Sequence, residues 1–165
     1  MRRQAMTAPR ITRRQLLGAV LAGAVPGWAT ANTTGAKAAL VIGNAHYKVG
    51  VLKNPLNDAM AVGGALRKLG FDVSQHTDTT LAQMIDAFVQ FSRRTQQAAV
   101  RVVYYAGHGV QVKGRNYLLP VDTEIRTEDD IPTKSADLSE FIERLSAQKH
   151  GMNIVILDAC RNNPF

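Results

Sequence analysis

Short apolar segments alternate with amphipathic ones along most of the chain, and this alternation is the strongest constraint on its fold. Apolar segments predict strands at residues 37–43, 98–106 and 153–158, and a further short strand is predicted to begin at 71–73. Helical patterns, with apolar residues three or four positions apart, lie between successive strands. Strands that alternate with helices in this way form parallel sheets, because each helix returns the chain to the edge where the previous strand began. The sequence therefore predicts an α/β fold of three layers, with a mainly parallel sheet between two layers of helices.

Start and stop signals bound the three predicted helices. Asn54 is expected to cap the first helix, which ends at Gly70. Thr80 and Gln83 form a capping box at the start of the second helix, and the third helix is expected over residues 137–151. The residues expected to face the core recur at helical spacing: Val62, Leu66, Leu69, Leu81, Met84, Ile85, Phe88, Phe91, Leu138, Phe141, Ile142 and Leu145.

The first 31 residues have the pattern of an export signal. A basic stretch that ends at Arg14 precedes an uncharged apolar run over 16–25 and the small residues 29–31. This order is typical of a secretory signal peptide, and the apolar run is too short for a bilayer, which takes about 20 residues. Thr-Arg-Arg-Gln-Leu-Leu at 12–17 resembles the twin-arginine export motif. The expectation is a bacterial protein exported to the periplasm or secreted, with no stable membrane span; the alternative is an uncleaved amphipathic anchor.

The excess positive charge of the chain lies mostly in that segment. The formal net charge is +7, and five arginines but no acidic residues lie within residues 1–31. The remaining 15 basic and 13 acidic residues leave a net charge of +2. A nucleic-acid partner requires a basic face on the folded domain, so this distribution argues against one.

Two side chains suited to nucleophilic chemistry follow the third and fourth predicted strands. His108 follows the strand at 98–106, and Cys160, the only cysteine, follows the strand at 153–158. Sequential parallel strands are usually neighbours and end at one edge of the sheet, so we expect the two side chains to lie close together. An imidazole beside a thiol can accept its proton. The backbone amides of Gly109 and Cys160 would then donate to a carbonyl oxygen that becomes negative.

The segments around these residues resemble the catalytic blocks of caspase-like cysteine peptidases, in which the histidine precedes the cysteine by about 50 residues. Four segments are similar to that family: Tyr-Tyr-Ala-Gly-His-Gly at 104–109, Asp-Ala-Cys-Arg at 158–161, Leu-Val-Ile-Gly-Asn at 40–44 and Asn-Asp-Ala at 57–59. The resemblance extends over residues 37–165. It implies a caspase-haemoglobinase-like fold, with His108 as the catalytic histidine and Cys160 as the nucleophile.

The same resemblance assigns a substrate pocket, and within the family it points to the bacterial metacaspase-like branch. Asp158 stands where aspartate-directed caspases carry glutamine, Asp58 matches a pocket carboxylate of the metacaspase branch, and Ala106 occupies a pocket position where that branch often has serine. Two carboxylates favour Arg or Lys through charge-assisted hydrogen bonds, so the expected activity is endopeptidase cleavage after Arg or Lys. For Asp58, stabilisation by the helix dipole is an alternative explanation. Asp158 is expected to end a buried strand, where an unpaired carboxylate costs free energy.

No metal or cofactor is expected from the residues. His46, His76 and His150 lack the spacing of metal ligands. Residues 109–135 are predicted to form a long, loose connection, and the acidic run at 128–130 is interpreted as a solvated part of it. Calcium enters only through the family resemblance, since this run lacks a recognisable calcium-binding loop.

Three functions remain open from the sequence. The first is an exported cysteine endopeptidase that acts on a peptide or protein substrate. The second is a catalytically idle caspase-like module that binds peptides. The third is a flavodoxin-like binder of small molecules, which would carry a glycine-rich phosphate loop that residues 43–46 do not supply.

The expected domain organisation is a signal peptide over residues 1–31 and a catalytic domain over residues 32–165, truncated after the nucleophile. Such a truncation would leave the last predicted strand at an open edge of the sheet. A partner chain or a second copy of this chain would then complete the sheet.

Overall fold

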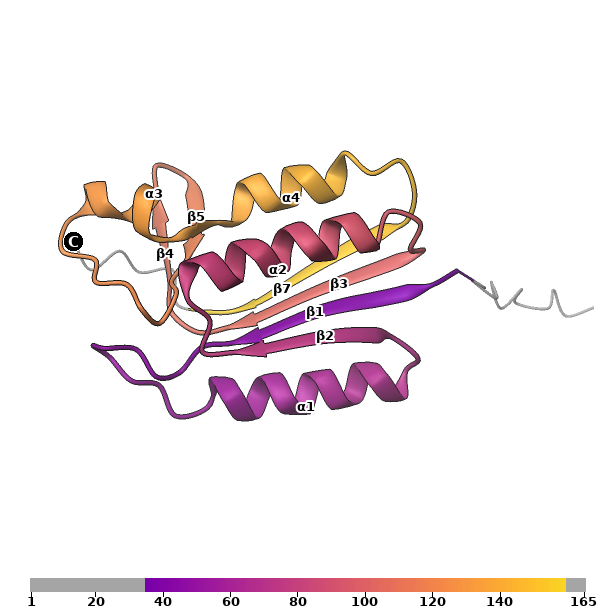
Figure 1. The fold of residues 1–165 in the computed structure, drawn as a ribbon, viewed down its shortest axis with the longest axis horizontal. Coiled ribbons are helices and arrows are strands. Elements are labelled where there is room, and N and C mark those ends of the chain that lie inside the picture. Colours follow the sequence, from indigo (N-terminus) through magenta and orange to yellow (C-terminus); the bar gives the residue numbers. More distant parts are fainter. Residues whose placement is uncertain (1–34, 160–165) are drawn as a thin grey trace, which may run out of the picture. The chain divides into compact units, whose positions relative to one another are not determined.

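Four parallel strands form the centre of the fold in the computed structural model, which describes residues 35–159. They are β1 (Lys37–Gly43), β2 (Asp72–Thr77), β3 (Val100–Ala106) and β7 (Met152–Asp158), in the order β2-β1-β3-β7. Helices α2 (Leu81–Arg94) and α4 (Leu138–Ser146) cover one face, and α1 (Pro55–Lys68) covers the other (Figure 1). The predicted three-layer α/β fold with a mainly parallel sheet is confirmed. The export signal at 1–31 and Cys160 lie outside the described residues.

The two inner strands, β1 and β3, are buried on both faces, which explains their largely apolar sequences. In β1, Leu40 and Ile42 pack into the cluster that includes Phe88 of α2 and Phe141 of α4. Val41, between them, packs instead with Ala59 and Val62 of α1 and with Tyr104 of β3. Each fully buried Leu, Ile or Val side chain contributes about 1.5–3 kcal/mol to the free energy of folding, so this strand anchors both layers.

Capping hydrogen bonds start two of the helices. The Thr80 side chain accepts from the Gln83 amide, and the Gln83 side chain accepts from the Thr80 amide, as predicted for α2. The Asp137 carboxylate accepts from the amides of Ser139 and Glu140 at the start of α4. Asn54 occupies the N-cap position of α1, as predicted, but its side chain makes no capping hydrogen bond.

Three of the predicted core positions are exposed instead. Leu69 has 63% of its surface exposed, Ile85 48% and Ile142 38%. Leu69 is the residue after the last turn of α1, and Ile85 lies at the border of the helix face that Met84, Phe88 and Phe91 already bury. α4 ends at Ser146, before Gly151, which precedes β7 with a positive φ of 90°.

Residues 109–135, predicted as a loose connection, hold a second sheet. β4 (Gly109–Val112) and β5 (Arg115–Leu118) form an antiparallel hairpin that β6 (Ala136–Asp137) extends, with positive φ at the turn residues 113 and 114. A 3₁₀ helix (Glu128–Asp130) and α3 (Ile131–Lys134) follow the hairpin. Glu128 and Asp129 are exposed, as expected for a solvated run, whereas the Asp130 carboxylate accepts from the backbone amides of residues 126 and 127 and pairs with Lys134.

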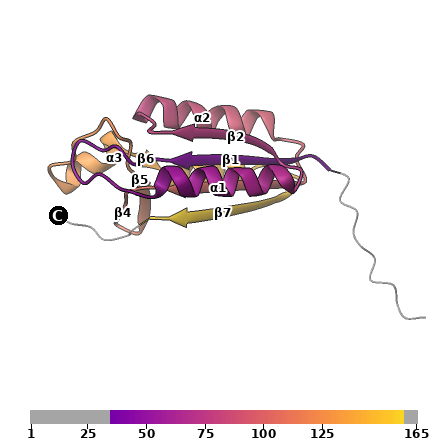
Figure 2. The ribbon, with the colours of Figure 1, turned by 90° about the horizontal axis from the view of Figure 1, so that it is seen from below.

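Strands β2 and β7 are the two edges of the parallel sheet (Figure 2). Along residues 35–159, β7 pairs only with β3. Met152, Ile154 and Ile156 of β7 are exposed large apolar side chains. They are in register with Val100, Val102 and Tyr104 of β3. The apolar surface of this edge strand is therefore partly open to solvent.

Candidate active site

The carboxyl ends of β3 and β7 lie side by side. Ala106 is the partner of Asp158 in the parallel register, and the Gly107 amide donates to the Asp158 carbonyl oxygen at 3.2 Å. The sequence prediction that these two strands are neighbours is therefore confirmed. The segment that contains His108 follows β3 and therefore begins beside the carboxyl end of β7.

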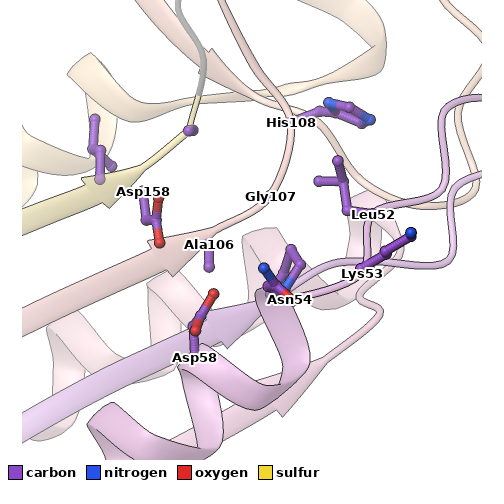
Figure 3. A pocket seen from close by; sticks show the side chains of 11 residues that line it. Leu52, Lys53, Asn54, Asp58, Ala106, Gly107, His108 and Asp158 are labelled. Carbon is purple, nitrogen blue, oxygen red and sulfur yellow. The ribbon is translucent and has the colours of Figure 1, made fainter.

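A cavity of about 560 Å³ opens at this edge of the sheet. It is lined by the segment before α1 and the first turn of that helix, by the end of β3 and by the end of β7. Figure 3 shows Asp58 and Asp158 on either side of Ala106, with His108 at the other end of the cavity. Four of the sequence-predicted site residues, Asp58, Ala106, His108 and Asp158, thus line one cavity. Ala159, which precedes Cys160 in the chain, lines it as well.

The imidazole of His108 is held by a backbone carbonyl group. Its Nε2 lies 2.6 Å from the carbonyl oxygen of Gly50. A carbonyl oxygen can only accept, so Nε2 donates and carries a proton. In the neutral imidazole Nδ1 is then the basic nitrogen, and among residues 35–159 no hydrogen bond occupies it.

Two tyrosines fix the backbone of His108. The Tyr47 hydroxyl accepts from the His108 amide at 2.8 Å, and the two rings lie 4.4 Å apart at their centroids with a tilt of 52°. The Tyr105 hydroxyl donates to the His108 carbonyl oxygen at 2.7 Å. Burial raises the pKa of both phenols, so both remain neutral near pH 7. No sequence pattern indicates the role of Tyr47, which is 61 positions from His108.

Gly107 lies tightly between these two phenols. A Cβ atom added to it would lie 2.5 Å from the Tyr47 hydroxyl and 2.7 Å from the Tyr105 hydroxyl. Ordinary carbon–oxygen contacts are longer, so any side chain here would displace a phenol that holds His108.

Gly107→Ala is expected to lower the free energy of unfolding by about 1–3 kcal/mol, because it overpacks a filled site. Urea unfolding would measure the change. Gly64→Ala is the matched control, since nothing lies within 4 Å of the added Cβ in helix α1, and it is expected to stabilise the protein by up to about 1 kcal/mol. Equal stability of Gly107→Ala and the native chain would contradict the close packing.

The two carboxylates of the cavity differ in environment. Asp58 is half-buried in the first turn of α1, so a helix-dipole contribution remains compatible with its position. Asp158 is exposed, which corrects the expectation of an unpaired carboxylate at the end of a buried strand. Its Oδ2 lies 3.3 Å from the Tyr104 hydroxyl, which donates to it. The partner and the exposure together remove the desolvation cost that the sequence argument assumed.

A buried asparagine joins the loops around this edge. Asn44 follows β1 and is fully buried. Its Oδ1 accepts from the amide and the hydroxyl of Thr79, and its Nδ2 donates to the Leu119 carbonyl oxygen. Leu119 in turn donates its amide to the carbonyl oxygen of His108. Asn44 therefore connects β1 and the start of α2 to the segment that carries the histidine.

The predicted oxyanion donors are only partly described. Gly109 is buried at the start of β4 and faces Leu118 of β5. Cys160 lies outside the described residues, so the role of these two amides stays a prediction.

The described part of the chain, residues 35–159, holds no group of three or more His, Cys, Asp or Glu side chains that could bind a metal ion. None of its helices combines the length and the apolar character that crossing a bilayer requires.

Comparison with known proteins agrees with this architecture. A family model described as the caspase domain matches residues 36–165. The chain belongs to the caspase-domain family. This membership removes the flavodoxin-like alternative, and it accounts for the parallel sheet flanked by helices on both faces.

Two curated relatives of this caspase domain are mammalian. The chain is 31% identical over 128 residues to mucosa-associated lymphoid tissue lymphoma translocation protein 1 of Homo sapiens. It is also 31% identical over 128 residues to the homologue of that protein in Mus musculus. The matched segment covers 76% of this chain but spans only 15% of the length of each relative.

Proposed function

We propose that this caspase domain is a cysteine endopeptidase that cleaves peptide bonds after Arg or Lys. The observation that carries the proposal is the single cavity that His108, Asp58, Asp158 and Ala159 line together. In this cavity His108 can act as a base, and the carboxylates of Asp58 and Asp158 can bind a cationic side chain of the substrate beside it. Membership of the caspase-domain family supports a cysteine peptidase activity.

The proposed reaction uses Cys160 and His108. The thiol gives its proton to Nδ1 of the imidazole, and the thiolate attacks the carbonyl carbon of the substrate. The oxygen becomes negative and accepts hydrogen bonds from the amides of Gly109 and Cys160. The imidazolium then protonates the leaving amine as the C–N bond breaks. Water hydrolyses the resulting thioester, and the thiol is regenerated.

The proposed specificity follows from the charge of the cavity. Asp58 and Asp158 present two carboxylates on either side of Ala106, whose small side chain leaves space between them (Figure 3). Ionised carboxylates form short, strong hydrogen bonds with guanidinium or ammonium groups and repel an acidic side chain. Lys53 also lines the cavity, and it is exposed at the mouth rather than between the two carboxylates.

A peptide panel tests this function. The full chain is offered fluorogenic peptides that differ only in the residue before the cleaved bond: Arg, Lys, norleucine or Asp. We expect kcat/KM for Arg or Lys to exceed that for norleucine by about 100-fold, the effect of two charge-assisted contacts, and no cleavage after Asp. Cleavage after Asp would overturn the proposed pocket. Absence of any cleavage would instead favour the catalytically idle peptide-binding module.

We further propose that the domain belongs to the bacterial metacaspase-like branch and that residues 1–31 direct its export by the twin-arginine route to the periplasm. The Thr-Arg-Arg-Gln-Leu-Leu segment, the short apolar run and the small residues that follow support this assignment. Residues 32–165 would then form the mature catalytic domain.

We also propose that another β-strand pairs with the open edge of β7. The exposed Met152, Ile154 and Ile156 support this interaction, since a strand added to the edge would cover apolar surface as well as unpaired backbone groups. A partner chain or a second copy would provide the strand.

A further inference from the structure

Two consecutive tyrosines in β3 place their hydroxyls on opposite faces of the sheet. Tyr104 packs with the α1 cluster, and Tyr105 packs with the cluster formed by α2 and α4. Neighbouring side chains of a strand point to opposite faces, which explains the division. Tyr104 is 5% exposed and Tyr105 is fully buried, so each hydroxyl needs a partner within the protein.

The Tyr105 hydroxyl serves the segment of the histidine. It lies 2.7 Å from the carbonyl oxygen of His108 and 3.0 Å from that of Leu119. It also lies 3.2 Å from the Tyr47 hydroxyl, which accepts from the His108 amide. All of these contacts are on the catalytic side of the cavity.

The Tyr104 hydroxyl contacts the carboxylate of Asp158 instead. It donates to Oδ2 of Asp158 at 3.3 Å. Burial raises the pKa of Tyr104 to about 12, and the charges of Asp158 and Asp58 add to this effect. The phenol is therefore a neutral donor near both acidic side chains. No other hydrogen bond from a residue in the described range reaches the Asp158 carboxylate, so Tyr104 alone fixes its orientation there.

We propose that Tyr104 is a positioning residue for the recognition of a basic side chain, because its hydroxyl orients Asp158 so that Asp158 and Asp58 bind one guanidinium group together. The inference rests on the proposed function and adds a residue to it. A neutral donor orients the carboxylate without neutralising it, so Asp158 keeps its charge for the ligand. Its second oxygen, Oδ1, remains available for that ligand.

This role predicts a difference between Arg and Lys. A guanidinium group forms two parallel hydrogen bonds in a fixed plane, and it depends on the orientation of the carboxylate. An ammonium group is a compact charge whose three donors rotate freely. Loss of the Tyr104 hydroxyl should therefore weaken recognition of Arg more than that of Lys.

Tyr104→Phe tests the proposal, because it removes only the hydroxyl. We expect KM for an arginine-ended peptide to rise about tenfold, the typical effect of one hydrogen bond to a charged group, with kcat within about twofold. The preference for Arg over Lys should fall. Tyr105→Phe is the matched variant on the other face, and it should lower kcat and leave KM nearly unchanged. Unchanged KM and unchanged Arg preference in Tyr104→Phe would overturn the proposal.

A double-mutant cycle separates positioning from simple packing. Asp158→Asn keeps an acceptor for Tyr104 but removes the charge. If Tyr104 acts through Asp158, adding Tyr104→Phe to Asp158→Asn should change KM by less than about twofold. A full tenfold further increase in the double variant would mean that Tyr104 acts by another route, and it would contradict the proposal.

Binding to the Cys160→Ala chain makes the result independent of turnover. An arginine-ended peptide is titrated into Cys160→Ala and into Cys160→Ala with Tyr104→Phe, and we expect Kd to be about tenfold higher in the second. If the peptide binds more weakly to the second chain but the native chain cleaves no peptide, the role of Tyr104 is supported and the peptidase activity is rejected. Equal affinities, or no binding to either chain, would reject the role of Tyr104. Cleavage after Arg by the native chain would still support the peptidase.

Discussion

His108→Ala, introduced into the full chain, is expected to lower kcat/KM for an arginine-ended peptide by about 10²–10⁴-fold. This range is typical of the loss of a positioned general base. The structure holds the imidazole by its Nε2 against the Gly50 carbonyl oxygen, which makes Nδ1 the proton acceptor. Without that acceptor the thiol of Cys160 would remain mostly protonated near pH 7, since its ordinary pKa is about 8.5. Initial rates of fluorogenic cleavage measure the effect.

Cys160→Ala is the companion variant and the control for contaminating peptidases. It is expected to show no cleavage above background, and the double variant should be no less active than Cys160→Ala, because the two groups act as one unit. The pH dependence of iodoacetamide alkylation gives a second readout. Alkylation of the native chain should reach half its maximal rate at a lower pH than in His108→Ala. Native activity in His108→Ala, or identical alkylation profiles, would reject the proposed pair.

The sequence was sufficient to predict where the site lies because that inference depends on strand ends. Strands β1, β3 and β7 are parallel neighbours, so the residues that follow them meet at one edge of the sheet. The prediction for Asp58 came from the family resemblance instead, and the structure places this residue in the first turn of α1, where it lines the same cavity. No long-range contact had to be known beyond the order of the strands.

The residues that hold the site could not be predicted in the same way. Tyr47 lies in a loop that has no periodic pattern, so its contact with His108 could not be predicted. The Gly50 carbonyl is a backbone group, which every residue has, so the residue type does not indicate its hydrogen bond to His108. The β4–β5 hairpin was missed because each strand has only four residues, too few for alternation to stand out from a loop. Exposure of Asp158 follows from the edge position of β7, which an apolar strand sequence does not reveal.

Arg101 is the other side chain whose role the sequence does not indicate. It lies in β3, and none of its surface is exposed. Its guanidinium group donates to the carbonyl oxygens of Thr95, Gln96 and His150 at 2.7–2.9 Å, and to Oδ1 of Asn153 at 3.3 Å. None of the ion pairs within residues 35–159 includes it. Burial lowers the pKa of Arg101, yet a guanidinium group stays protonated near pH 7, so carbonyl dipoles alone compensate its charge.

These contacts connect the segment after α2 with the segment before β7. Residues 95 and 96 follow α2, whereas residues 150 and 153 flank the start of β7, so the guanidinium group joins two connections at the amino edge of the sheet. Gly151 lies against it, since a Cβ added there would be 2.8 Å from Nη1 of Arg101. The buried Arg101 guanidinium group therefore stabilises the neighbouring strands β3 and β7 at the end of the sheet opposite the candidate site.

Arg101→Met is expected to lower the free energy of unfolding by about 3 kcal/mol, because it removes the charged donor from the carbonyl oxygens of Thr95, Gln96 and His150, and hydrogen bonds of a charged group contribute about 1.5–3 kcal/mol each. The midpoint of thermal unfolding should fall by roughly 10 °C. Arg101→Lys should lower the free energy of unfolding by an intermediate amount. Its single ammonium group keeps the charge but cannot reach all the acceptors that surround the three nitrogens of the guanidinium group. Arg93→Met, at an exposed position in the last turn of α2, is the matched control and should cost less than about 1 kcal/mol. Equal stability of the Arg101 and Arg93 variants would contradict the structural role of the buried guanidinium group.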